Sequence, residues 1–291
     1  MGLGTLRWLW THPLARHGRR AAFGRFLRWQ LGSRLVGGSV AHPFVGASRL
    51  LVAPGMRGAT GNVYAGLHEF ADMGFVLHAL RPGDLFVDVG ANVGSYTVLA
   101  ATTGARVVAL EPLPVTYAHL MANVRLNGFE GRVQALNAGA GRDDATLRFS
   151  ADLDAMNHVL LHDAVPDAAL NVPSYRLDGV LDGARPLVVK VDVEGWEAEV
   201  VAGAEGTLGG TDPRAVLIEL TGLGARYGFD DAAVRRTLEA FGYAPATYRP
   251  LTRRLTPEPV ESENVLFVRD LPFFQERVQT APTYSVQGMP V

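Results

Sequence analysis

The sequence predicts an α/β fold, in which a doubly wound, mostly parallel sheet is closed by an antiparallel strand and preceded by an N-terminal helix and hairpin extension. Two observations predict this fold. Short apolar runs rich in Val, Leu and Ile recur through the middle of the chain, and most are followed by a segment that suits a helix. Strands that alternate with helices are typical of a parallel sheet with helices on both faces.

The N-terminal part of the chain shows helical periodicity before the first buried strand. Over residues 14–35, apolar residues recur at i, i+3 and i+4 spacing, which predicts a helix. Residues 42–52 predict a short β-hairpin, and 54–66 form a glycine-rich stretch. A second helix is expected over about 67–80, because an Arg-Pro-Gly sequence after it is a sharp stop.

The predicted sheet begins after this second helix. Buried strands are expected at 85–92, 106–112, 132–139, 186–195 and 214–220. Helices are expected at 96–103, 114–127, 196–208 and about 230–241. Residues 145–150 resemble an edge strand, and 243–250 with 264–270 predict the antiparallel pair that closes the sheet. We therefore divide the chain into the N-terminal extension, a central domain and a weakly structured C-terminal tail, at 1–63, 64–270 and 271–291.

Composition excludes several classes of protein. Hydrophobic residues make up 48% of the 291 residues, which is enough for a sizeable core. The chain has no cysteine, so disulfides, thiolate metal sites and a cysteine nucleophile are excluded. There is no apolar run of about 18 residues to span a membrane, and the first apolar stretch is too short for a secretory signal. We expect a cytoplasmic protein that can also associate with a membrane surface.

Charge is distributed unevenly along the chain. Residues 1–68 contain nine arginines and no Asp or Glu, so all 29 acidic residues follow them. A basic segment on an acidic body predicts contact with something anionic. One hypothesis is an interfacial helix at 14–35 that contacts anionic lipid. Another is that this helix packs on the body or on a second subunit of a homo-oligomer. A nucleic-acid partner is not expected, because nothing else resembles an RNA-binding module.

The loop after the first buried strand has the composition of a ligand-binding turn. In VDVGANVGSYT, Gly90 and Gly94 let the backbone approach a ligand closely, with Asn92 between them. Asp88 and Glu111 end neighbouring strands, where ligands of open sheets bind, and Glu111 can accept hydrogen bonds from two ribose hydroxyls. The Gly-x-Gly-x-x-Gly pattern of dinucleotide sites is absent. Asp88 would repel a pyrophosphate but attract the cationic groups of S-adenosylmethionine (SAM), so charge favours SAM over NAD.

Four segments of the chain carry a resemblance to a known family. They are VDVGANVGSYTVLA, ALEPLPVTYAHLMANVRLNG, VVKVDVEGWEAEVVAGA and LIEL. In their order and approximate spacing they resemble successive blocks of the FkbM methyltransferase family, and the resemblance covers about residues 64–268. Asn92 stands where most methyltransferases carry glycine, and it is this family's own variant. The resemblance implies a class I methyltransferase (Rossmann-like) fold and methyl transfer from SAM, commonly to a hydroxyl of a sugar or polyketide.

Two further residues are candidates for cofactor binding. Glu69 precedes the first buried strand and is expected to reach the SAM amino group, a role that the resemblance favours over that of a solvated helix residue. Asn137 lies near the end of the third strand, where it is placed to meet the adenine edge. The alternative for Asn137 is a turn residue without a ligand.

Charged residues alternate at the end of the fourth strand. Lys190, Asp192 and Glu194 are two apart, so their side chains point to one side of an extended strand. Flanking carboxylates keep a lysine charged, so Lys190 is expected to be an orienting ion-pair partner. Asp192 is the first candidate to contact the acceptor or take its proton, and His158 is an alternative base. The alternative for the three strand residues is a buried polar brace.

Two of these carboxylates and one on the next strand are also candidate metal ligands. Asp192, Glu194 and Glu219 can supply the oxygen ligands that hard cations prefer. No dense ligand pattern requires an ion, and we predict none.

The leading hypothesis is SAM-dependent O-methylation of a hydroxyl on a sugar, a glycan or a polyketide-like natural product. On the sequence alone two alternatives stay open. One is a nicotinamide-dependent oxidoreductase, which the glycine spacing disfavours. The other is a non-catalytic protein that binds SAM or a glycan. The acceptor is not readable, because acceptor pockets are built from loops.

Overall fold

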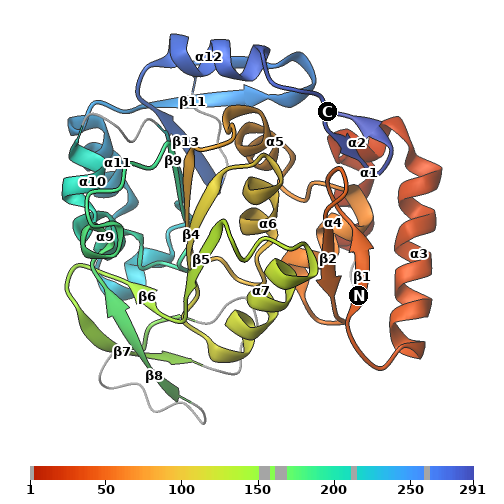
Figure 1. The fold of residues 1–291 in the computed structure, drawn as a ribbon, viewed down its shortest axis with the longest axis horizontal. Helices are drawn as coiled ribbons and strands as arrows, with labels where there is room; N and C mark the ends of the chain where they lie inside the picture. The colour runs from red at the N-terminus through yellow and green to blue at the C-terminus, as the bar shows by residue number, and fades with distance from the viewer. Residues whose placement is uncertain (1–2, 151–157, 161–168, 211–214, 259–262) are drawn as a thin grey trace.

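A computed structural model describes residues 3–150, 158–160, 169–210, 215–258 and 263–291. Its centre is an eight-stranded sheet with the order β12-β11-β13-β10-β9-β3-β4-β5 (Figure 1). The strands are β3 Leu85–Val89, β4 Arg106–Leu110, β5 Val133–Leu136, β9 Val188–Val191, β10 Ala215–Glu219, β11 Ala244–Arg249, β12 Arg254–Thr256 and β13 Asn264–Val268. β10, β9, β3, β4 and β5 are parallel, whereas β13 is antiparallel to β10 and β11. The predicted mostly parallel sheet with an antiparallel closing strand is confirmed.

Helices cover both faces of this sheet. One core contains side chains of α5, α6, α7 and α12, at Phe70–Ala79, Ser95–Thr102, Pro114–Leu126 and Leu271–Gln279. The other contains side chains of α8, α9, α10 and α11, at Leu177–Leu181, Glu197–Ala202, Glu205–Gly209 and Asp231–Ala240. Alternate residues of one strand enter different cores, as Phe86 and Val87 of β3 do. This two-sided burial explains why the strands read as continuous apolar runs.

The N-terminal extension is mainly helical and joins the first core through Leu9, Leu14, Phe26 and Trp29. Its elements are α1 Leu3–Thr11, α2 Pro13–His17, α3 Arg19–Leu35, the hairpin strands β1 Val40–Pro43 and β2 Arg49–Val52, and α4 Arg57–Ala65. The predicted hairpin is confirmed, and the predicted long helix is split at Gly18. The glycine-rich stretch, which carried no prediction of a helix, mostly forms α4.

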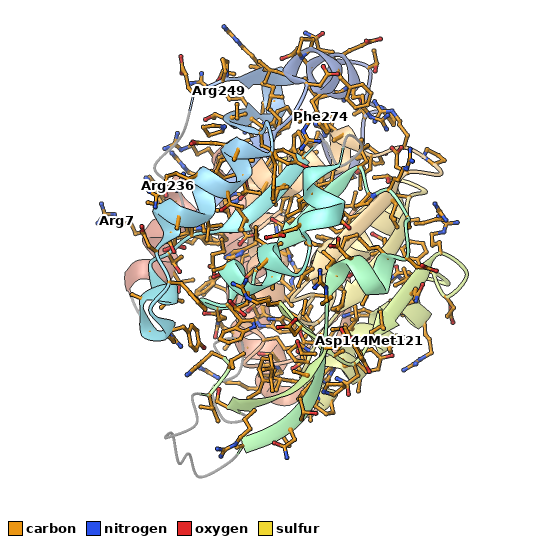
Figure 2. All side chains as sticks on the ribbon, turned by 90° about the vertical axis from the view of Figure 1, so that its left-hand side faces the viewer. Arg7, Met121, Asp144, Arg236, Arg249 and Phe274 are labelled. Carbon is orange, nitrogen blue, oxygen red and sulfur yellow. The ribbon has the colours of Figure 1, made fainter. Side chains whose placement is uncertain are left out.

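The apolar stripe of α3 is only partly covered. Phe26 is buried, but Leu27, Leu31 and Leu35 are 57%, 66% and 87% exposed. Packing on the body therefore accounts for one side of the helix and leaves an apolar row on the other side. Arg7 of α1 also points away from the body (Figure 2). None of the described helices is long and apolar enough to cross a lipid bilayer.

The C-terminal residues correct the prediction of a weakly structured tail. They form α12 and a hairpin of β14 and β15, at Ser285–Val286 and Met289–Pro290. Asp270 caps α12, because its carboxylate accepts a hydrogen bond from the backbone N–H of Phe273 at 3.0 Å. Phe274 and Val278 lie four residues apart and are fully buried. The prediction missed this short amphipathic repeat, which covers a full turn of the helix.

A small second sheet follows β5 in the chain. It has the order β6-β8-β7, with bounds Gly139–Ala140, Ala169–Tyr175 and Ala145–Ser150. The edge strand predicted at 145–150 is thus confirmed as β7, although it pairs with β8 outside the main sheet. Val159 forms an isolated bridge with Phe149 of β7, and both side chains reach the cavity described next.

Candidate active site

A cavity of about 280 Å³ opens at the carboxyl ends of β3, β4, β9 and β10. β3 lies between β4 and β9, so the strand order reverses there, and ligands of doubly wound sheets bind at such a point. The loops after the four strands bring Gly90, Glu111, Asp192 and Glu219 to its walls. The cavity therefore lies at the strand ends where the sequence predicted a cofactor site.

The two glycines of the loop after β3 are required by protein packing. Gly90 has a φ of +80°, and a Cβ on it would lie 1.8 Å from the backbone oxygen of Asp192. Gly94 has a φ of +89°, and a Cβ there would lie 2.5 Å from Leu120 Cδ1. A larger residue at Gly90 would push the loops after β3 and β9 apart. Close approach of a ligand, the role that the sequence suggested, is therefore not needed to explain either glycine.

Glu111 is held by the loop that it faces. Its two carboxylate oxygens accept hydrogen bonds from the backbone N–H groups of Asn92 and Leu113, both at 2.9 Å. Burial raises the pKa of Glu111 to about 7. Asn92 has a φ of +51°, and its Oδ1 accepts a hydrogen bond from the backbone N–H of Val93. This arrangement fixes Glu111 on the cavity wall, where a carboxylate retains lone pairs for ligand hydroxyls.

Asn137 lies beside this loop and braces it. Its amide nitrogen donates hydrogen bonds to the backbone oxygens of Glu111 and Pro112, both at 2.9 Å. The cavity wall next to it is made by Ala138 and Gly139. The expected contact of Asn137 with an adenine edge stays a prediction.

A smaller cavity of about 80 Å³ lies next to the first and is lined by Glu69, Asp88, Tyr96, Lys190 and Asp192. Lys190 Nζ lies 2.7 Å from Asp192 Oδ2 and 4.7 Å from the centre of the Tyr96 ring. Burial alone would lower the pKa of Lys190, but the charges of Asp192, Asp88 and Glu69 outweigh it and raise that pKa above its usual range. Lys190 is therefore a charged ion-pair partner, as the flanking carboxylates predicted.

Asp88 lies deeper than its position at a strand end suggested. Its side chain is fully buried, and Oδ2 accepts a hydrogen bond from the Thr97 hydroxyl at 2.6 Å. Burial raises the pKa of Asp88. Its other oxygen, Oδ1, is buried without a hydrogen-bond partner among the residues that the structure describes. Glu69 is more accessible, and its Oε2 accepts a hydrogen bond from the Tyr96 hydroxyl at 2.5 Å.

Three carboxylates meet at the wall of the main cavity. Oxygens of Asp192, Glu194 and Glu219 all lie within 4.8 Å of one another. Burial and the charge of Asp192 raise the pKa of Glu194 to about 7 and raise that of Glu219 further. Glu194 has a φ of +56°, an unusual backbone for a residue with a side chain. The cluster can hold a proton or attract a cation, and the prediction that no metal is needed stays a prediction.

Two site residues were not predicted from the sequence. Glu197 is 5% exposed, and its Oε1 accepts hydrogen bonds from the backbone N–H groups of Val193 and Gly195, both at 3.1 Å. It thereby fixes the loop that carries Glu194. Trp196 lines the main cavity. The sequence signal for Glu197 was its place in the first turn of a helix, where carboxylates commonly bond backbone N–H groups.

His158 lies on the short described segment between β7 and β8. Its backbone N–H donates a hydrogen bond to Ser150 Oγ at 3.1 Å. The neighbouring Val159 lines the main cavity. A role of His158 as general base stays a prediction.

The residues present fit a cationic nucleoside such as SAM. Among the described residues, the walls of the main cavity carry five carboxylates and neither lysine nor arginine; the carboxylates belong to Glu69, Glu111, Asp192, Glu194 and Glu219. Two buried oxygens, Asp88 Oδ1 and Glu219 Oε2, have no hydrogen-bond partner in the part of the chain that the structure describes. Unpartnered buried oxygens are costly and favour a ligand that donates hydrogen bonds or carries positive charge.

Comparison with known proteins agrees with this chemistry. The sequence model of the methyltransferase FkbM domain matches residues 88–245, which is more than half of the chain. The hexuronic acid methyltransferase AglP of Haloferax volcanii is 29% identical over 136 residues, which cover 46% of this chain and 55% of that protein. The 31-O-demethyl-FK506 methyltransferase FkbM of Streptomyces tacrolimicus is 32% identical over 171 residues, which cover 47% of this chain and 66% of that protein.

Among solved structures, a methyltransferase FkbM from Methylobacillus flagellatus is similar, with a TM-score of 0.45 and 20% identity. The similar region covers 65% of this chain and 44% of that one. The family match begins at Asp88 and therefore includes the carboxyl ends of β3, β4, β9 and β10, which surround the main cavity. The chain therefore belongs to the FkbM family of SAM-dependent methyltransferases.

Proposed function

We propose that this protein transfers the methyl group of SAM to a hydroxyl oxygen of a saccharide or a polyketide-like natural product. The observation that carries the proposal is the main cavity, because four of its five carboxylates, those of Glu111, Asp192, Glu194 and Glu219, lie at or just after strand ends within the family match. The names of the two relatives state a hexuronic acid in one case and 31-O-demethyl-FK506 in the other. The matched regions span 55% and 66% of those relatives. A similar acceptor for this chain is therefore a proposal.

We assign cofactor binding to two groups of side chains. Glu111 would accept hydrogen bonds from the ribose hydroxyls, because its carboxylate is fixed on the cavity wall. The anionic residues around the inner cavity, of which Glu69 is more accessible than Asp88, would hold the ammonium group. When bound, SAM supplies a methyl carbon attached to a positively charged sulfur.

We assign removal of the acceptor proton to the carboxylate cluster. A positioned base contributes on the order of 10²–10⁴ in rate. Asp192 is the first candidate, because its side chain is partly exposed and is oriented by Lys190 at 2.7 Å. Glu194 is the second, because a pKa of about 7 suits a base that works near neutral pH.

One experiment separates methyl transfer from the two alternative functions. Thermal unfolding of the full chain is measured with S-adenosylhomocysteine (SAH) and, separately, with NAD. A ligand present at 100 times its Kd stabilises the folded state by about 2.7 kcal/mol. We expect a shift with SAH and none with NAD. A shift with NAD alone would indicate an oxidoreductase, and a shift with SAH but no methylation of any hydroxyl acceptor would indicate a binding protein.

We also propose that the outer side of α3 contacts anionic lipid. The exposed row of Leu27, Leu31 and Leu35 lies in a segment that carries arginines and no carboxylates, as in helices that lie at membrane interfaces. The test is sedimentation with vesicles that contain phosphatidylserine. Binding should fall for a Leu27→Gln, Leu31→Gln double variant, and equal sedimentation of this variant and the wild-type chain would refute the contact.

A further inference from the structure

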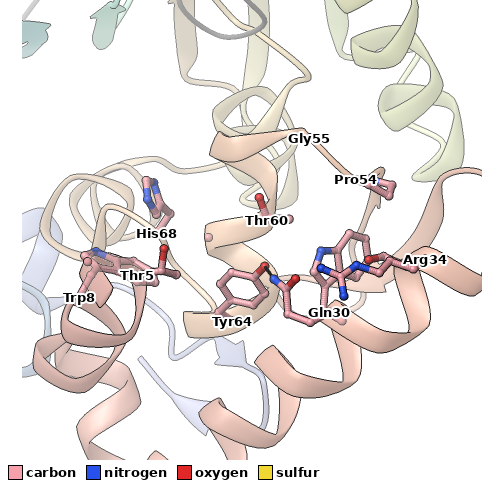
Figure 3. A pocket seen from close by; sticks show the side chains of 13 residues that line it. Thr5, Trp8, Gln30, Arg34, Pro54, Gly55, Thr60, Tyr64 and His68 are labelled. Carbon is pink, nitrogen blue, oxygen red and sulfur yellow. Dashed lines mark hydrogen bonds between the residues drawn. The ribbon is translucent and has the colours of Figure 1, made fainter. Parts of the chain in front are cut away.

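A second large cavity lies outside the carboxylate-rich one, in the N-terminal extension. It has a volume of about 740 Å³ and is bordered by α1, α3, α4 and the turn before α4. Figure 3 shows His68, Thr5 and Trp8 at one end, Arg34 and Pro54 at the other, and Thr60 and Tyr64 between them. We call this cavity the N-terminal groove.

The walls of the groove combine aromatic rings with neutral hydrogen-bonding groups. The rings belong to Trp8, Trp29, Tyr64 and His68, and the neutral polar side chains to Thr5, Gln30, Ser33 and Thr60. Rings offer flat apolar surfaces, and hydroxyl and amide groups exchange hydrogen bonds with hydroxyl groups. A sugar ring needs both, since it has apolar C–H faces and a rim of hydroxyls. The groove therefore matches a saccharide better than a purely apolar ligand.

The charge on the groove is positive. Arg34 is the single charged residue on its described walls, and no carboxylate of the described chain reaches them. The groove also lies within the first 68 residues, which carry nine arginines and no acidic residue. An exposed guanidinium can bind a carboxylate or a phosphate through two parallel hydrogen bonds. The ligand of the groove should therefore carry an anionic group, unlike the ligand of the active-site cavity.

His68 joins the groove to the active site. This residue lines the groove, the main cavity and the inner cavity. Its ring centre lies 5.2 Å from that of Trp8, and its backbone N–H donates a hydrogen bond to Asn62 Oδ1 at 2.8 Å. A Cβ on Gly61 would lie 2.1 Å from His68 Cδ2, so the glycine makes room for this ring. A ligand that extends along the groove past Thr60 would thus reach the wall that the active site shares.

We propose that the N-terminal groove binds an anionic saccharide portion of the acceptor, with its carboxylate or phosphate against Arg34 and a sugar ring against Trp8. The proposal rests on the proposed methyl transfer, because it takes the groove ligand to be the acceptor. It narrows the acceptor to a glycan with an acidic residue or a sugar phosphate, whose hydroxyl enters the carboxylate-rich cavity beyond His68.

The test uses the full chain with saturating SAH and three probes: a glucuronic acid disaccharide, glucose 1-phosphate and the neutral disaccharide cellobiose. Affinity is measured by titration calorimetry, and the fluorescence of Trp8 and Trp29 gives a second readout. We expect at least one anionic probe to bind more tightly than cellobiose. The probe that binds shows whether the anionic group is a carboxylate or a phosphate.

Two variants of α3 show whether Arg34 is responsible. Arg34→Glu should weaken binding of the anionic probe at least tenfold. Arg28→Glu is the matched control, because Arg28 is exposed on the same helix, does not line the groove and undergoes the same charge change. Its affinity for the probe should stay within about twofold of the wild-type value, since distant exposed charges are screened by salt.

Several outcomes would overturn the inference. These are equal affinity of Arg34→Glu and wild type, equal loss in both variants, or no preference of the wild-type chain for either anionic probe over cellobiose. Failure of the proposed methyl transfer would look different, because the wild-type chain would then bind the anionic probe normally but show either no thermal shift with SAH or no methylation of a hydroxyl acceptor.

Discussion

The active-site cavity and the N-terminal groove differ most clearly in charge. The described walls of the first carry five carboxylates and neither lysine nor arginine, whereas those of the second carry Arg34 and no carboxylate. They nevertheless share the side chain of His68. Two adjoining cavities of opposite charge suit two ligands of opposite charge. The arginine-rich beginning of the chain and its acidic remainder are therefore separate in sequence, and each forms a cavity that suits a ligand of opposite charge.

The main cavity also differs from the groove because its buried carboxylates lower the stability of the folded protein. Burial raises the pKa of Glu111 and Glu194 to about 7 and that of Glu219 further. Ionisation of these three carboxyl groups is therefore less favourable in the folded protein than in the unfolded chain. Charges that oppose folding are retained where they serve a ligand or a reaction. Arg34 is exposed and carries no comparable penalty. The largest functional effects are therefore expected from the acidic cavity.

The largest expected effect is loss of turnover in Asp192→Asn. The amide cannot accept the acceptor proton, so turnover should fall by on the order of 10²–10⁴. Affinity for SAH, measured by calorimetry, should stay within a few-fold of wild type, because Glu69, Glu111 and Asp88 remain. Unchanged turnover would remove Asp192 as the base and limit the cavity to binding.

The Glu194→Gln variant tests the other candidate for the base. If Glu194 takes the proton, wild-type turnover should fall about tenfold per pH unit below about 7, since its carboxyl must be deprotonated. The Glu194→Gln variant would then lose both the turnover and this pH dependence. A pH profile that is the same in this variant and in the wild type would assign the proton to another group.

A smaller effect is expected from Glu111→Gln on cofactor affinity. An amide has one acceptor oxygen, so it cannot accept both backbone N–H groups that Glu111 holds, and it removes a negative charge. SAH should bind about tenfold more weakly, which corresponds to about 1.4 kcal/mol. Glu239→Gln is the matched control, because Glu239 is exposed on α11 and lies outside the cavity. Equal affinities in the two variants would contradict the assignment of Glu111.

Stability should depend on pH through Glu219. The unfolded glutamate loses its proton near pH 4.5, whereas burial and the neighbouring Asp192 raise the pKa of the folded one to about 9. Between pH 7 and 9 the folded state therefore holds more protons, and its stability falls as pH rises. We expect the Tm to be about 2–4 °C lower at pH 9 than at pH 7.

Glu219→Gln should remove most of this pH slope. The buried His12 and His78 do not obscure the measurement, because their lowered pKa values act below pH 6.5 and with the opposite sign. A slope in Glu219→Gln equal to that of the wild-type chain would show that Glu219 is already ionised in the fold.

The smallest effect is expected from metal removal. Asp192, Glu194 and Glu219 converge closely enough to hold an ion, but the cationic cofactor can meet the same charge. Treatment with EDTA should change methylation by less than about twofold. A large loss that Mg²⁺ or Mn²⁺ restores would instead place a metal in the acidic cavity and would contradict the prediction.

The sequence predicted the sheet and much of the cavity because both depend on local patterns. The run 85–92 places apolar residues on both faces of its strand, and Asp192 and Glu219 come at or just after the ends of two other strands of this kind. Parallel strands bring their carboxyl ends to one edge, so the convergence of these residues follows from strand order alone. The ion pair of Lys190 with Asp192 could also be predicted from the sequence, because the two residues are two apart along the chain at the end of one strand.

Other features escaped because they depend on distant contacts. The apolar repeat of Phe274 and Val278 covers a single turn, and it becomes recognisable only when α12 packs against α5. Asp88 ends a strand like Glu111, yet only the packing of Thr97 and Lys190 around it shows that it is fully buried. Arg34 and His68 are far apart in sequence, and nothing in the pattern of either indicated a common groove.

The sequence by itself determined the α/β class, the position of the site at the strand ends and the acidic character that suits a cationic cofactor. Periodicity and charge are properties of residues close together in the sequence. In a strand they predict directly which side chains share a face of the sheet and which lie at its edge. Only the tertiary structure decided which carboxylates are buried and unpartnered, and that α1, α3 and α4 enclose a basic groove beside His68. Burial and enclosure depend on the packing of segments far apart in the chain, which a local pattern does not specify.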